Sequence, residues 1–120
     1  MTKSKFRDLT VWKAARQLAR NIYQATRSFP RDEQFGMTQQ MRRAAVSILS
    51  NIAEGSGRWS PADQKHFYVM ARGSALELES QIVIAEDVEY LPPQTATDLT
   101  SEIVEVACML NGLMRYLDKT

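Results

Sequence analysis

The stretch of sequence that decides the fold runs from Gln39 to Gly55 and reads QQMRRAAVSILSNIAEG. Together with Met37 just before it, the stretch repeats apolar residues at three- and four-residue steps, which is the spacing of one helix face. These residues are Met37, Met41, Ala44, Ala45, Ile48 and Ile52. A polar seam follows one edge of that face, also at helical spacing, and consists of Gln40, Arg43, Ser47, Asn51 and Glu54. The stretch therefore predicts a helix with an apolar core face and a polar border.

The polar seam has two interpretations. Buried polar groups must be hydrogen-bonded, and a fully bonded set fixes one packing register between helices. In this structural interpretation, which we favour, Arg43 pairs with Glu77 and the seam's last two residues, Asn51 and Glu54, hold the following loop. The alternative is a ligand site.

Three further helices are predicted around this one, and no segment has the pattern of a strand. The first covers about 10–28 and ends at Phe29-Pro30, because a residue before proline is disfavoured in the helical region. The third opens at Ser60-Pro61, a capping serine followed by proline at the first helical position, and continues to about residue 89. Leu91-Pro92-Pro93 ends it, and the fourth covers about 95–118.

The spacing of the apolar residues indicates how these helices pack. The fourth has a heptad seam of Leu99, Ile103, Val106, Leu110, Leu113 and Leu117, and the first has a similar seam of Trp12, Ala15, Ala19, Ile22, Thr26 and Phe29. Such seams favour crossing angles near about 20°. Short connections make successive helices antiparallel. We therefore predict one all-α domain over residues 1–120, an antiparallel up-down-up-down four-helix bundle.

The third predicted helix has apolar residues on two opposite sides. Its predicted core stripe is Phe67, Ala71, Ser74, Leu78, Ile82 and Ala85, and Val69, Leu76 and Val83 recur every seven residues on the other side. An outer helix of a monomeric bundle should be polar there. The second line predicts an interface with another subunit, so we expect a homo-oligomer.

Composition sets limits on the compartment and the class of protein. Apolar residues make up 44% of the 120 residues and charged residues 24%, which is ordinary for a globular domain. A single cysteine, Cys108, excludes an intrachain disulfide and fits a reducing compartment. The sequence shows neither a signal peptide nor a membrane-spanning run. We predict a soluble, cytoplasmic protein with no membrane partner.

Charge is divided unevenly along the chain. Residues 1–60 have eleven Lys and Arg against four Asp and Glu, whereas residues 61–120 have four against ten. The interpretation that we favour is that basic helices pack beside acidic ones, in the same subunit or a neighbour. The alternative is a basic face for an anionic partner.

No catalytic, metal or cofactor constellation is found in the sequence. His66 is the sole histidine, so two Glu-x-x-His repeats for a metal pair cannot be assembled. Cys108 has no second cysteine for zinc, and the Gly55-Ser56-Gly57 loop is too short to hold a phosphate. We predict no enzyme activity, no cofactor and no small-molecule substrate; an enzyme that uses Asn51 and Glu54 in a cleft is the least favoured alternative.

The first predicted helix has one face with the composition of a binding surface. Within a narrow sector of its circumference lie Lys13, Arg16, Arg20 and Arg27, bordered by Trp12 and Tyr23. Regularly spaced cations with adjacent aromatic rings suit the phosphates and exposed bases of RNA. The alternative is a solvated face whose arginines contact acids of a neighbouring subunit.

Five ordered motifs resemble one protein family. They are 6–12 (FRDLTVW), 29–30 (FP), 40–47 (QMRRAAVS), 51–55 (NIAEG) and 73–79 (GSALELE). The chain resembles the bacterial four-helix bundle proteins related to the rRNA intervening-sequence proteins. The resemblance implies a left-handed bundle that assembles as a ring of five. Accessory proteins of diversity-generating retroelements are similar in fold and strongly basic, whereas this chain is nearly neutral.

Two functions of different classes are therefore expected. The first is a non-enzymatic oligomeric scaffold that binds RNA through the first helix. The second is a protein-interaction scaffold whose charge asymmetry serves ring assembly alone.

Overall fold

The computed structural model describes residues 4–119, and these residues form four α-helices and no strand. The helices are α1 (Thr10–Thr26), α2 (Met37–Ser56), α3 (Pro61–Asp87) and α4 (Pro93–Asp118). Two short 3-10 helices, η1 (Lys5–Asp8) and η2 (Arg31–Glu33), precede α1 and α2. The all-α prediction is confirmed.

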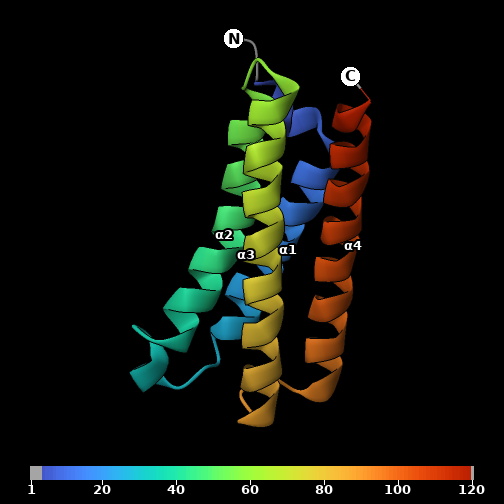
Figure 1. Ribbon diagram of the computed structural model, residues 1–120. Coiled ribbons are helices and arrows are strands. Elements are labelled where there is room, and N and C mark those ends of the chain that lie inside the picture. Colours follow the sequence, from blue (N-terminus) through green and yellow to red (C-terminus); the bar gives the residue numbers. More distant parts are fainter. Residues whose placement is uncertain (1–3, 120) are drawn as a thin grey trace.

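The four helices lie lengthwise beside one another, and both chain ends lie at the same end of the molecule (Figure 1). Each helix packs against its sequence neighbours, and α1 also packs against α4. Within residues 4–119, no Cα atoms of the diagonal pairs α1–α3 and α2–α4 lie within 8 Å of each other. The molecule is elongated, with extents of 46 × 31 × 20 Å. These contacts are those of a bundle.

Both ends of α3 have a recognisable local cap. Ser60 caps α3 as predicted, because its Oγ accepts a hydrogen bond of 3.1 Å from the backbone N–H of Asp63. The same helix ends where Glu89 adopts a φ of 64°, the left-handed conformation that closes many helices. The end of α2 differs from the prediction: the helix continues through Gly55, and Gly57, just after it, has a φ of −89°.

Gly55 lies where α2 comes closest to α3. A Cβ at this position would be 2.8 Å from Tyr68 Cε1, 3.1 Å from the carbonyl oxygen of Gln64 and 3.1 Å from Phe67 Cβ. The glycine is therefore required by close approach between two helices and not by its backbone conformation.

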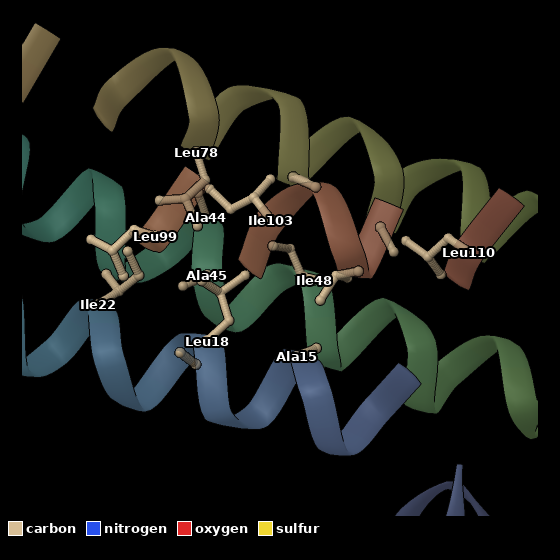
Figure 2. Packing of buried hydrophobic residues seen from close by; sticks show 14 of the residues in the cluster. Ala15, Leu18, Ile22, Ala44, Ala45, Ile48, Leu78, Leu99, Ile103 and Leu110 are labelled. Atoms are coloured by element: carbon tan, nitrogen blue, oxygen red, sulfur yellow. The ribbon is translucent and has the colours of Figure 1, made fainter. Parts of the chain in front are cut away.

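The apolar faces of all four helices meet in one core, part of which is shown in Figure 2. Its largest fully buried side chains include Leu18, Ile22, Met41, Ile48, Ile52, Leu78, Ile82, Ile103 and Leu110. The predicted stripes of α1 and α2 are buried except for the half-buried Met37. In α4 the predicted Leu113 is half-buried, and Met114 is buried in its place.

The core stripe predicted for α3 is wrong at two positions. Tyr68 and Ala75 are buried, whereas Phe67 and Ser74, one residue earlier in each case, are half-buried. The other four predicted positions are buried, and Tyr68 and Ala75 complete their three- and four-residue spacing. Ser74 Oγ instead hydrogen-bonds Ser47 Oγ at 2.9 Å, which holds Ser74 at the α2–α3 border beside the core.

Candidate nucleic-acid interface

The cations of α1 form a line on the side of the helix that borders α2. Lys13, Arg16 and Arg20 are exposed, Arg27 follows just past the helix end, and α1 itself contains no acidic residue. Because the residues are three, four and seven positions apart, helical geometry places them on one side. The sequence prediction of a cationic line on one helix side agrees with this placement.

A hollow of about 380 Å³ opens between this line and α2. It is lined by Arg16, Ala19, Arg20, Tyr23, Gln24, Arg27 and Leu49. Lys13 is not among them, so Arg16, Arg20 and Arg27 are the cations that face the hollow. Three guanidinium groups around one depression make it positively charged, and guanidinium forks match the geometry of carboxylates and phosphates.

A second hollow, of about 460 Å³, adjoins the first through a shared residue, Tyr23. It is lined by Tyr23, Gln34, Phe35, Thr38, Gln39, Arg42, Arg43 and Val46. We call the two hollows together the α1/α2 groove. No acidic residue lines either one. The groove therefore presents five arginines without a compensating carboxylate.

Arg42 fixes the wall between the two hollows. Its Nε donates a hydrogen bond of 2.9 Å to Thr26 Oγ1, one of its terminal nitrogens donates to the carbonyl oxygen of Tyr23 at 3.3 Å, and its guanidinium carbon lies 4.6 Å from the centre of the Tyr23 ring. A cation near the last carbonyls of a helix and over an aromatic face is favourable in both respects. Arg42 thus stabilises the packing of α1 on α2 and holds one face of Tyr23.

Sequence reasoning missed Phe35 and Arg42 of this groove, as well as the amides of Gln34 and Gln39. Phe35 has 82% of its surface exposed, and it lies after η2, outside every predicted helix. Arg42 and Arg43 are adjacent in the sequence, and it is the packing of α2 on α1 that brings Arg42 into contact with α1. No local pattern identifies either residue as part of a surface shared with α1.

The two aromatic residues predicted beside the cations differ in accessibility. Tyr23 is 40% exposed, but Trp12 is only 8% exposed and belongs to the core. The Trp12 ring packs edge-on against Phe6 at 4.9 Å, and Arg16 lies over it at 5.8 Å. Because these contacts and the core cover Trp12, we remove it from the candidate surface.

The polar seam of α2 is bonded at its centre and exposed at its ends. Asn51 Nδ2 donates to the carbonyl oxygen of Ser47 at 2.9 Å and to Ser47 Oγ at 3.1 Å. Gln40, Arg43 and Glu54 are exposed, and Glu54 pairs with Arg58 at 3.2 Å. Within residues 4–119, Arg43 forms no ion pair with Glu77, so its charge remains available at the rim of the groove.

The apolar line on the outside of α3 is exposed in the single subunit. Val69 is 40% exposed, Leu76 63% and Val83 52%. Cys108 is exposed on α4. The interface predicted at the α3 line stays a prediction.

The acidic side of the molecule includes a half-buried carboxylate on the border between α1 and α4. Asn21 Nδ2 donates a hydrogen bond of 2.7 Å to Glu102 Oε1. Burial raises the pKa of the Glu102 carboxyl above its ordinary value, the hydrogen bond from Asn21 lowers it, and the nearby carboxylates of Asp98 and Glu105 raise it further. This border is therefore the acidic counterpart of the basic groove.

Residues 4–119 contain no group of three or more His, Cys, Asp or Glu side chains arranged to hold a metal ion. None of the four helices is both long enough and apolar enough to cross a membrane.

Comparison with known proteins gives a family and a fold. The family model described as 23S rRNA-intervening sequence protein matches residues 7–112. A crystal structure of a protein of unknown function from the S23 ribosomal protein family of Bacteroides thetaiotaomicron superposes with a TM-score of 0.79 at 22% identity, over 88% of this chain and 98% of that one. No curated protein matches the chain. At that identity, the structural similarity supports the fold alone.

Proposed function

The chain belongs to the 23S rRNA-intervening sequence protein family, and from that premise we propose that it is a non-enzymatic, oligomeric, cytoplasmic protein that binds RNA through the α1/α2 groove. The observation that carries this proposal is the composition of the groove: its two adjoining hollows are lined by five arginines and no acidic residue. Phosphate contacts supply most of the affinity of proteins for nucleic acids, and a basic groove is their usual signature.

Not all five arginines are equally available for phosphates. Arg42 is committed to Thr26 and Tyr23 inside the protein. Arg16, Arg20, Arg27 and Arg43 are exposed and make no ion pair within residues 4–119. These four are the side chains that we assign to the RNA backbone.

Assembly is the second part of the proposal. The exposed apolar line of Val69, Leu76 and Val83 on α3 would be covered by a neighbouring subunit. Because one half of the chain is basic and the other acidic, a head-to-tail contact brings unlike charges together. Head-to-tail contacts form rings where the rotation between successive subunits closes. By family resemblance, we propose a ring of five. By the same resemblance, we propose that the bundle is left-handed. We also propose up-down-up-down helix order, which is supported by both chain ends lying at one end of the bundle (Figure 1) and by the lack of close Cα approaches between diagonal helices over residues 4–119.

A second candidate function is a protein scaffold in which the same arginines serve only ring assembly. The acidic surface around Glu102 favours it, because a neighbouring subunit could place such carboxylates against the α1/α2 groove. The two candidates differ in what happens when the arginines are removed.

The test measures RNA affinity against salt for the full chain by fluorescence anisotropy with a labelled RNA oligonucleotide. Four phosphate contacts to a single strand predict a slope of log affinity against log salt of about −2.8, and Arg16→Gln with Arg20→Gln should reduce it to about −1.4. The matched control removes two exposed cations from the other side, Arg115→Gln with Lys119→Gln, and should leave the slope unchanged.

Light scattering on the same samples separates the two candidates. An intact oligomer with a reduced slope supports RNA binding at the groove. Loss of the oligomer in the Arg16 and Arg20 variant, with no measurable RNA binding by the parent, would establish the scaffold in place of the RNA-binding function.

A further inference from the structure

We infer that the α1/α2 groove takes single-stranded RNA in preference to a double helix, with Phe35 as the surface on which a base stacks. The inference rests on the proposed function and adds the substrate class. Its starting point is that the two hollows of the groove have different chemistry although they share Tyr23.

The hollow near the middle of α1 has the composition of a phosphate site. Its polar residues are Arg16, Arg20, Arg27 and Gln24, besides the shared Tyr23. The other hollow combines the exposed ring of Phe35 with the exposed side-chain amides of Gln34 and Gln39. A flat ring stacks on a base, and amides can both donate to and accept from a base edge. The division predicts phosphates at the first hollow and a base at the second.

The segment that carries Phe35 is held from both sides. Glu33 Oε1 accepts a hydrogen bond of 3.1 Å from the backbone N–H of Met37, at the start of α2, and Glu33 Oε2 accepts one of 2.9 Å from the Tyr90 hydroxyl, beyond α3. The ring of Tyr90 also packs at 5.3 Å from that of Phe29. Phe35 is thus an 82% exposed ring on an anchored turn. Because the turn is already held, little conformational freedom is lost when a base stacks on the ring.

The Phe35 ring is free to accept a base. None of the other aromatic rings in residues 4–119 packs against it. Tyr23, by contrast, already has Arg42 over its ring at 4.6 Å. Phe35 is therefore the stacking residue, and the Tyr23–Arg42 pair is the wall that separates the base from the phosphates.

A double helix would leave this second hollow unused. In A-form RNA the base faces are stacked inside the duplex, and proteins contact mainly phosphates and 2′-hydroxyl groups. Single strands expose base faces, and proteins that bind them combine a cationic groove with aromatic stacking surfaces. The exposed ring of Phe35 beside the amides of Gln34 and Gln39 fits the binding of a single strand.

The experiment compares two probes with the full chain at one salt concentration, by anisotropy. One probe is a labelled, unpaired RNA oligonucleotide, and the other is the same strand annealed to its complement. We expect tighter binding of the single strand. Phe35→Ala should weaken single-strand binding by about 5- to 100-fold and leave duplex binding unchanged. Phe35→Trp, which keeps a stacking ring, should restore it.

The matched control is Tyr116→Ala, which removes a 65% exposed ring from α4 and should change neither affinity. Equal binding of both probes, with no effect of Phe35→Ala, overturns the single-strand inference but leaves the proposed function standing. Absence of binding to either probe overturns both. If Phe35→Ala lowers the mass measured by light scattering without changing RNA affinity, the ring contacts a second subunit and the inference is wrong.

Discussion

Replacing Gly55 by alanine tests the closest helix–helix approach in the molecule. In an open helix this change is favourable by about 0.5–1 kcal/mol, because alanine loses less backbone freedom on folding than glycine does. Gly73 provides that reference, since it lies in α3, is exposed, and has no atom within 4 Å of the position of an added Cβ. Gly73→Ala should therefore raise the free energy of unfolding by that amount.

At Gly55 the added methyl group meets three obstacles at once. It would be 2.8 Å from Tyr68 Cε1, 3.1 Å from the carbonyl oxygen of Gln64 and 3.1 Å from Phe67 Cβ. Tyr68 is only 3% exposed and cannot swing into solvent, and the other two atoms belong to the backbone or lie next to it. Overpacking of this kind costs about 1–3 kcal/mol. After subtraction of the propensity gain, we expect Gly55→Ala to lower the free energy of unfolding by about 1 kcal/mol at mid-range, and by about 2.5 kcal/mol at most.

The assay is urea and thermal unfolding of the two variants and the parent, followed by circular dichroism at one protein concentration, because assembly makes stability depend on concentration. For a domain of this size, the mid-range loss corresponds to a fall in Tm of about 4 °C. If Gly55→Ala stabilises the protein as much as Gly73→Ala does, α2 and α3 are not in the close contact described, and the reasoning is refuted.

Three further outcomes are expected. Leu110→Ala should lower the free energy of unfolding by about 2–5 kcal/mol in urea titrations, since Leu110 is fully buried, whereas Tyr116→Ala on the same helix should stay within about 0.5 kcal/mol of the parent. The raised pKa of Glu102 means that its protonated form favours the folded state, so its contribution is complete below the ordinary value of 4.5 and is lost as pH rises through the raised value. The free energy of unfolding should fall less for Glu102→Gln than for the parent as pH rises through that value. An equal fall in both proteins would assign the pH dependence to other groups. Leu76→Glu with Val83→Glu should dissociate the oligomer, measured by light scattering, without loss of helix, measured by circular dichroism. A parent that is already monomeric at tens of micromolar, about the range in which weak assemblies form, contradicts the proposed interface.

The fold could be predicted because three of the helices have a single apolar face. In α2 and α4 the spacing of residues such as Ile48, Ile52, Ile103 and Leu110 leaves one choice of core side, and all four are buried. In α3 apolar residues occur on several sides of the helix, so the pattern does not determine which residue of two neighbours faces the core. Hydrogen bonding of Ser74 to Ser47 supplies the missing information, and it depends on the packing of another helix.

The candidate site could be predicted only in its local part. Helical spacing is sufficient to place Arg16, Arg20 and Arg27 on one line. The same spacing puts Trp12 both in the apolar seam of the first helix and beside the cations, and only its burial, at 8% exposure, decides for the core. The second wall of the groove, with Phe35 and Arg42, exists only because α1 packs on α2 and η2 places the turn between them. Such non-local geometry has no signature in a short stretch of sequence.

The contact between α1 and α4 has a consequence for the order of folding. Three of the four helix pairs in contact are neighbours along the chain, whereas Asn21 and Glu102 are 81 residues apart. Local contacts form quickly, and the closure of a long loop carries the largest entropic penalty. We therefore expect hairpins of successive helices to form first and the docking of α1 on α4 to complete the bundle. Amide hydrogen exchange should then find the lowest-energy opening at this same border, where a half-buried carboxylate weakens the closure.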